Sequence, residues 1–90
     1  MMDETARPLI VLTQSFLAGE MDASTFDEGF REIFSRMPHL EEETFFALEN
    51  LAVACSDYIE EPEFRLEETD LDEEGLRAAA THALTRLGLA

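Results

Sequence analysis

The sequence predicts an all-α fold, an antiparallel four-helix bundle, and three observations carry this prediction. Apolar residues recur in four separate segments at the three- and four-residue intervals of amphipathic helices. No segment alternates apolar and polar residues over the length of a strand. Short stretches separate the four segments, so successive helices should pack antiparallel. The expected helices span about residues 7–18, 23–37, 41–60 and 71–87.

The first expected helix is bounded by proline and glycine. Pro8 suits the first turn, where a missing backbone N–H is tolerated, and Gly19 suits the C-terminal cap. The face expected to be buried consists of Leu9, Leu12, Thr13, Phe16 and Leu17.

Either Asp22 or Ser24 can cap the N-terminus of the second helix. Asp27 stands three residues after Ser24, a spacing that resembles a capping box. Pro38 closes the helix, because proline cannot continue the hydrogen-bond ladder. The expected buried stripe consists of Phe26, Phe30, Ile33, Phe34 and Met37.

The third expected helix is the central helix of the bundle. Its first turn carries Glu41, Glu42 and Glu43, where the helix dipole favours anions. Pro62 makes the preceding residue a poor helical residue and lacks a backbone donor, so the helix should end near Glu60. The expected buried stripe consists of Phe45, Leu48, Ala52, Cys55 and Ile59, with Phe46 and Val53 beside it.

A loop of about ten residues should join the third helix to the fourth. Asp70 stands at the start of the fourth helix with Glu73 three residues later, and Gly88 stops the helix at its other end. The expected buried stripe consists of Leu76, Ala79, Ala80, Ala83, Leu84 and Leu87.

The composition is that of one small soluble domain. Ninety residues are too few to divide, so residues 1–90 should form a single domain, and 46% hydrophobic residues with seven Phe are enough for a packed core. No apolar run approaches the roughly 20 residues that span a bilayer, and the N-terminal residues Met1–Glu4 are acidic where a secretory signal is basic. Cys55 is the one cysteine, which fits a reducing compartment. We therefore expect a cytoplasmic protein.

The acidic residues are concentrated in one part of the chain. Residues 41–74 hold 14 of the 21 Asp and Glu, with Arg65 the only base, so this stretch carries about −13 of the total charge of −15. Such a one-sided field indicates a basic partner. Six Arg and no Lys argue against direct binding of nucleic acid or an anionic membrane. A halophilic surface would be acidic throughout, whereas the residues outside 41–74 are nearly balanced in charge. The plain alternative is a solvated acidic face that binds no partner.

Candidate sites for metal binding or catalysis are weak. Asp70–Gly75 matches the first half of a calcium-binding EF-hand loop, but Thr81 stands where a bidentate Glu is needed. His39 and His82 are isolated, so we expect surface histidines rather than zinc ligands. Cys55 lies on an apolar stripe, where burial explains it better than reactivity does. We therefore expect no metal, no cofactor and no enzymatic activity.

Residues in both halves of the chain resemble the colicin D immunity protein family. The individual motifs are common, but their order and spacing agree together over most of the 90 residues. The residues similar to the opening signature of that family are Leu12, Phe16, Leu17, Ala18, Met21, Ala23 and Phe26. Those similar to its acidic-Pro-acidic corner and to its fourth-helix segment are Glu61, Pro62, Glu63, Leu71, Asp72, Gly75, Leu76 and Leu84.

The resemblance implies an immunity protein that binds the C-terminal nuclease domain of a toxin, in a 1:1 complex. Toxins of this kind cut the anticodon loop of transfer RNA, and the inhibitor would cover the basic active site with carboxylates where substrate phosphates lie. The acids to which the resemblance points are Glu61 and Glu63, with Asp57 and Glu60 beside them. The run Glu41–Glu43 and the lack of Lys depart from the family pattern, so the toxin and its RNA substrate stay open.

Setting aside the acids with local structural roles leaves a corner around Pro62. Glu41–Glu43 and Asp70–Glu74 act as helix-start charges and caps. The acids expected to contact the toxin are Asp57, Glu60, Glu61, Glu63, Glu67 and Glu68.

An alternative function is that of an acidic DNA mimic or anti-repressor, since charge alone does not separate one basic partner from another.

Overall fold

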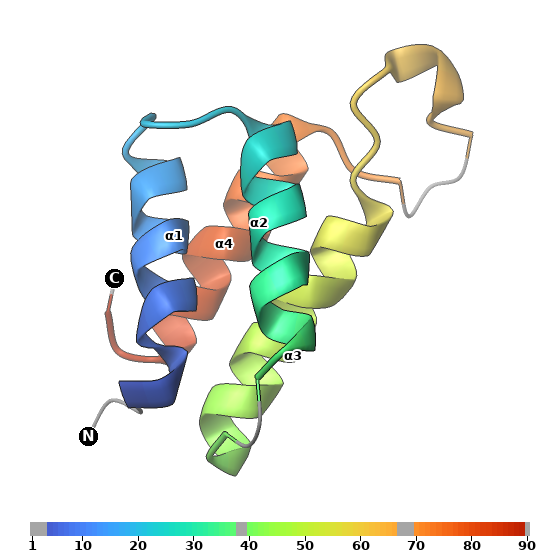
Figure 1. The fold of residues 1–90 in the computed structure, drawn as a ribbon. Coiled ribbons are helices and arrows are strands. Elements are labelled where there is room, and N and C mark those ends of the chain that lie inside the picture. The colour runs from blue at the N-terminus through green and yellow to red at the C-terminus, as the bar shows by residue number, and fades with distance from the viewer. Residues whose placement is uncertain (1–3, 38–39, 67–69, 90) are drawn as a thin grey trace.

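Four α-helices make up the fold of the computed structural model, which describes residues 4–37, 40–66 and 70–89 (Figure 1). Within these ranges there is no β-strand, and one isolated parallel bridge joins Tyr58 to Leu71. The elements in chain order are η1 (Glu4–Ala6), α1 (Arg7–Leu17), α2 (Ala23–Ser35), α3 (Glu42–Asp57), η2 (Pro62–Phe64) and α4 (Glu73–Arg86), where η denotes a 3-10 helix.

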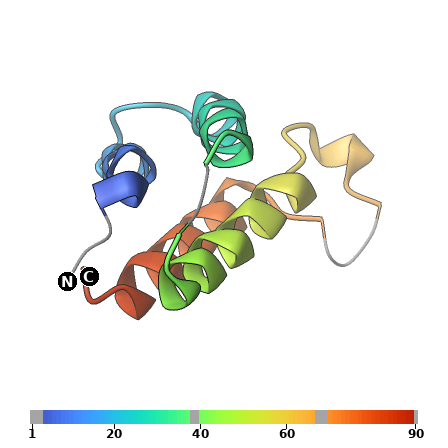
Figure 2. The same cartoon turned by 60° about the horizontal axis from the view of Figure 1, so that its bottom comes forward.

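The helices alternate in direction and form two layers. α1 contacts α2 and α4, and α3 contacts the same two helices. Figure 1 shows the four helices running up and down in turn. In Figure 2, α1 and α2 form one layer, and α3 and α4 run obliquely beneath it. The predicted all-α, antiparallel four-helix bundle is confirmed.

Phenylalanine rings form the centre of the core. The rings of Phe16 and Phe26 stack with centroids 4.3 Å apart, and the Phe30 ring follows at 5.6 Å from Phe26. All three side chains are fully buried, and each contributes about 1.5–3 kcal/mol to folding by leaving water. The guanidinium of Arg77 in α4 lies 4.7 Å from the centroid of the Phe16 ring, a cation–π contact between the layers.

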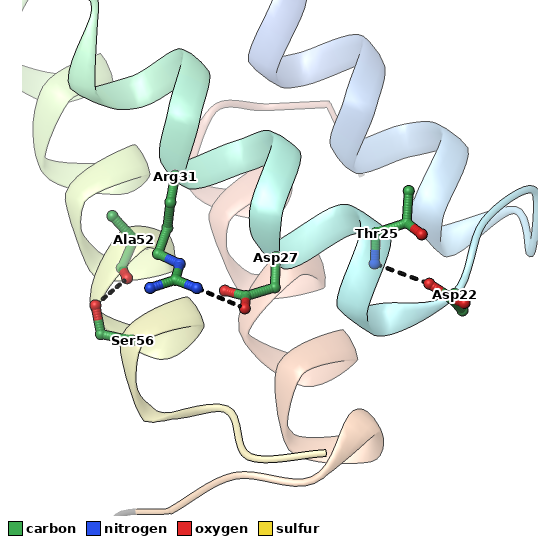
Figure 3. A network of polar contacts seen from close by, with 6 residues as sticks. All are labelled: Asp22, Thr25, Asp27, Arg31, Ala52 and Ser56. Carbon is green, nitrogen blue, oxygen red and sulfur yellow. Dashed lines mark hydrogen bonds and ion pairs between the residues drawn. The ribbon is translucent and has the colours of Figure 1, made fainter.

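The ends of α1 and α2 follow local sequence signals, with one correction. Gly19 ends α1 in the left-handed region, at φ 82°. Asp22 caps α2 by accepting a hydrogen bond from the backbone N–H of Thr25 at 2.8 Å, which lowers the pKa of Asp22 (Figure 3). The predicted capping box is wrong, because Ser24 already lies within the helix and the Asp27 side chain is buried.

α3 buries Leu48 and Cys55 as predicted, but not the whole predicted stripe. Phe45, Phe46 and Val53 are 40%, 47% and 54% exposed, so the prediction that Phe45 belongs to the buried stripe is wrong. α3 packs against both α2 and α4, and the spacing of apolar residues along one line does not identify a face shared between two neighbours. The residues that α3 buries are Thr44, Ala47, Leu48, Leu51, Ala54 and Cys55.

α3 also ends at Asp57, earlier than the predicted end near Glu60. Tyr58 takes up an extended backbone, because the residues on either side of it pair with Leu71. The N–H of Leu71 donates to the carbonyl of Asp57 at 2.8 Å, and the N–H of Ile59 donates to the carbonyl of Leu71 at 3.0 Å. This pairing joins segments distant in sequence, so no local signal announces it. Ile59, predicted on the helical stripe, lies in the extended segment.

α4 begins at Glu73, later than predicted, and its cap is Asp72 rather than Asp70. The carboxylate of Asp72 accepts a hydrogen bond from the N–H of Gly75 at 2.8 Å. Asp70 instead accepts one from the N–H of Leu66 at 2.9 Å. Four members of the predicted stripe are buried as expected, namely Leu76, Ala80, Ala83 and Leu84.

A buried carboxylate interrupts the apolar contact between α2 and α3. Oδ2 of Asp27 accepts a hydrogen bond from Nη2 of Arg31 at 3.0 Å (Figure 3). Oδ1 is buried and accepts no hydrogen bond of ordinary geometry within the described residues, although the thiol of Cys55 lies beside it. Removal from water raises the pKa of Asp27 despite the Arg31 charge. Burial also raises the pKa of the Cys55 thiol to about 12.

The raised pKa of Asp27 predicts a dependence of stability on pH. A carboxyl whose pKa is higher in the folded state favours folding when protonated, so the cost of its charge is present at neutral pH and is lost as the pH falls through the folded-state pKa. We expect Asp27→Asn to raise the free energy of unfolding at pH 7, measured by urea denaturation, and we expect this gain to shrink toward zero below about pH 4.

Glu28→Gln is the matched control, because it removes the same charge from an exposed neighbour on the same helix. Its gain at pH 7 should be smaller. A difference between Asp27→Asn and the wild type that stays constant across the pH range would contradict the prediction.

Candidate functional site

Glu60, Glu61 and Glu63, three of the acids predicted to bind a partner, lie in a segment that is closed at its base. We call residues 58–66 and 70–71 the corner loop. The Tyr58–Leu71 bridge holds the two ends of this loop side by side. Both views show the loop projecting beyond the end of α3, on the side of the molecule away from α1 (Figures 1 and 2). The loop is therefore a protruding feature with a fixed base.

Pro62 begins a 3-10 turn within the corner loop. Its ring fixes φ and needs no backbone donor at the first position of the turn. The N–H of Phe64 donates to the carbonyl of Glu61 at 3.1 Å, and the N–H of Arg65 donates to the carbonyl of Pro62 at the same distance. These bonds place Glu61, Glu63 and Phe64 on one tight turn.

The guanidinium of Arg65 braces the corner loop from inside. Its Nε donates to the carbonyl of Ile59 at 2.7 Å, and its Nη2 donates to the carbonyl of Glu60 at 3.0 Å. Arg65 thus binds the backbone just after α3 and, among the residues that the structure describes, forms no ion pair with a carboxylate. Hydrogen bonds from a charged donor are stronger than neutral ones, so one side chain ties the turn to the end of α3.

A glycine at the start of α4 makes room for Leu71, the residue at which the loop closes. A Cβ at Gly75 would stand 3.1 Å from Cδ2 and 3.3 Å from Cβ of Leu71, closer than side-chain carbons ordinarily approach. Leu71 is the residue that pairs with Tyr58. The missing side chain at Gly75 therefore lets the loop close against the first turn of α4.

Three carboxylates of the corner loop face solvent. Glu60, Glu61 and Glu63 are exposed, and none of them forms an ion pair in the parts of the chain that the structure describes. Asp57, at the end of α3, is half-buried. Glu67 and Glu68 lie outside the described residues. The ion pairs lie elsewhere and join Arg7 to Glu4, Arg31 to Asp27, Arg36 to Glu32 and Arg77 to Glu73.

Two apolar residues of the corner loop did not figure in the sequence prediction. Phe64 is 59% exposed and Leu66 is 84% exposed. Neither belongs to the hydrophobic core or packs against it. The sequence does contain a pattern that could have identified them, because both lie outside the four amphipathic stripes and within a segment rich in Glu.

The other acidic segments have structural roles. Glu42 and Glu43 lie in the first turn of α3, as predicted. In the candidate calcium loop, α4 already begins at Glu73, and Asp72 is engaged as its cap. Among the described residues, no group of three or more His, Cys, Asp or Glu is placed to hold a metal ion. The segment is a helix start, which is the plainer of the two readings of its sequence.

The remaining candidate groups are isolated. His82 is exposed, as predicted, and His39 lies outside the described residues. Cys55 is buried, as predicted, and its raised pKa disfavours the thiolate that a nucleophile needs. None of the helices described has the length and apolar character needed to cross a membrane.

Comparison with known proteins gives one family. Residues 6–87 match the model of a family described as bacterial self-protective colicin-like immunity. The matched region contains all four α-helices and the corner loop. A search of curated proteins finds no match.

Arg65→Met tests whether the guanidinium braces the corner loop. The change removes two hydrogen bonds from a charged donor, each contributing about 1.5–3 kcal/mol, so the loop should open more often. We expect the backbone amides of Phe64 and Arg65 to exchange hydrogen at least about tenfold faster, as measured by NMR, while core amides of α3 keep their rates.

Arg86→Met is the control, because it removes the same charge from an exposed position at the end of α4. It should leave exchange in the corner loop unchanged. Equally faster exchange in both variants would show that the loss of charge, not the loss of bracing, opens the loop. Wild-type exchange rates in Arg65→Met would also contradict the prediction.

Proposed function

The chain belongs to the bacterial self-protective colicin-like immunity family, and from this we propose that its corner loop binds and inhibits the cognate toxin. The target is the basic C-terminal nuclease domain of that toxin, held in a 1:1 complex in the cytoplasm of the producing cell. Glu60, Glu61 and Glu63 stand where the phosphates of the RNA substrate would lie. Inhibition is by occupation of the active site and needs no catalysis by the immunity protein.

The observation that carries this proposal is that a braced loop holds three exposed carboxylates, Glu60, Glu61 and Glu63, which form no ion pair within the described residues. Arg65 is the base nearest to them in sequence, and its guanidinium donors are directed to backbone carbonyls. The carboxylates of Glu60, Glu61 and Glu63 are therefore open to a cationic partner. Because the base of the loop is already fixed, little backbone freedom is lost on binding, and more of the interaction energy appears as affinity.

The chemistry of a ribonuclease fits this surface. A cleft that holds RNA is lined by Lys, Arg or His, and the excess of negative charge in residues 41–74 steers such a cleft toward the loop. A carboxylate beside a catalytic His raises the pKa of that His and holds it as a cation. A His held in this way cannot accept the proton that RNA cleavage requires of a general base. Inhibition thus combines blocked access with loss of the base.

A DNA mimic that occupies a basic DNA-binding protein would use the same charge, but membership of an immunity family favours the toxin. The two functions are separated by the gene that lies directly upstream, which for an immunity protein encodes the toxin. The proposed transfer RNA substrate follows from the resemblance to colicin D immunity proteins, and binding to the toxin domain is the first property to test.

Charge reversal tests the corner. We expect Glu61→Lys or Glu63→Lys to weaken inhibition of the toxin's C-terminal domain at least about tenfold, because each places a cation against a cationic cleft. Both positions are exposed, so the thermal midpoint should change little. The measurement is residual RNA cleavage as a function of immunity-protein concentration, together with thermal unfolding.

Glu20→Lys is the control, since Glu20 is exposed in the turn between α1 and α2, which both views place away from the corner loop. It makes the same change in net charge and should weaken inhibition much less. Wild-type inhibition by both Glu61→Lys and Glu63→Lys would contradict the assignment of these residues to the toxin-binding site.

Electrostatic steering predicts a specific dependence on salt. Raising ionic strength from about 50 mM to about 0.5 M shortens the Debye length from above 10 Å to below 5 Å. We expect the association rate constant with the toxin domain to fall at least about tenfold over this range, while the dissociation rate constant changes less. Stopped-flow or surface-based kinetics give both constants, and a salt-independent association rate would contradict steering.

A further inference from the structure

The corner loop presents an aromatic side chain for which the fold offers no role. Phe64 is 59% exposed and contacts no other aromatic ring within the described residues. It neither belongs to the hydrophobic core nor packs against it. Keeping so much apolar surface in water lowers solubility, and such exposed surface is typical of interaction sites.

The exposed aromatics of α3 differ from Phe64 in this respect. The ring of Phe45 lies 6.1 Å from that of Phe34, and the ring of Phe46 lies 5.9 Å from that of Phe45. These rings continue the series of aromatic contacts that begins in the core, since the Phe34 ring lies 5.9 Å from that of the buried Phe30. Phe45 and Phe46 therefore have ring contacts within the fold, whereas Phe64 has none among the described residues.

The backbone at Phe64 is held in place. Its N–H donates to the carbonyl of Glu61, and the next residue, Arg65, is tied by its own N–H to Pro62 and by its guanidinium to the end of α3. An aromatic side chain has only two rotatable bonds, so little conformational entropy remains to be lost when it enters a pocket. The position is that of a preorganised anchor.

We propose that Phe64, with Leu66 beside it, is an apolar anchor that enters a pocket next to the basic cleft of the toxin. This inference rests on the proposed function and adds a second type of contact to it. Aromatic residues at the centre of interfaces commonly dominate binding energy when polar groups surround them and exclude water. Glu61 and Glu63 lie on the same turn as Phe64 and supply polar groups beside it.

The surrounding charges select a basic protein over a second copy of this chain. Two corner loops facing one another would bring Glu60, Glu61 and Glu63 of each copy together, and each copy carries a net charge of −15. A partner with cations around an apolar pocket satisfies both the carboxylates and the ring. Charge then determines the class of partner and the speed of encounter, whereas Phe64 determines which member of the class stays bound.

Phe64→Ala separates these two roles. We expect the Kd for the C-terminal domain of the toxin encoded by the adjacent gene to rise about ten- to a hundredfold, almost entirely through faster dissociation. The association rate and its salt dependence should stay at wild-type values, because no charge changes. Phe64→Leu, which keeps an apolar side chain, should recover part of the affinity, and the thermal midpoint of both variants should equal that of the wild type.

Phe46→Ala is the matched control, because it removes an aromatic ring of similar exposure from α3. It should change the Kd less than about threefold. Wild-type binding by Phe64→Ala, with Glu61→Lys still defective, would overturn the anchor and leave the proposed function standing. Normal binding by both Phe64→Ala and Glu61→Lys would show that the corner loop is not the toxin-binding site. A loss of folding stability in Phe64→Ala, or dimerisation of the free protein that depends on Phe64, would also overturn the anchor.

Discussion

The pairing of Tyr58 with Leu71 is the contact on which the rest of the structure depends. Its two backbone hydrogen bonds each contribute only about 0.5–1.5 kcal/mol, which is little beside the aromatic core. Their effect is geometric. α3 has to stop at Asp57, and the chain has to return beside its own exit before α4 begins. If α3 continued toward Pro62, the acids would lie spread around a helix instead of on one protruding turn.

The parts of the fold that depend on local signals are those that the sequence predicts well. The apolar stripe of α4 and the glycines at the ends of α1 and α4 are patterns that span only a few residues. The structure shows the stripe buried and both glycines at positive φ. The end of α3 and part of its buried face were predicted wrongly because both depend on distant segments. Leu71 sets the end, and simultaneous packing against α2 and α4 sets the face, so that Phe45 is exposed.

The charge of the candidate site is visible in the sequence, whereas its shape is not. A run of Glu around a proline shows where the acid is, but no local pattern predicts that Arg65 donates to the backbone carbonyls of Ile59 and Glu60. The buried Asp27 was likewise mistaken for a capping residue, because a spacing of three residues fits both a cap and an inward-facing turn of helix. Sequence spacing gives the position of a residue on a helix, and packing decides which partner that position meets.

The bracing contacts of Arg65 have a consequence for how the protein changes over evolutionary time. They end on the carbonyl oxygens of Ile59 and Glu60, which are main-chain atoms that every amino acid carries. Substitution of the side chains at these positions leaves the acceptors in place. The corner loop can therefore exchange its outward-facing residues one at a time while its frame persists. An immunity protein built in this way can follow a drifting toxin without having to find a new fold for its binding surface.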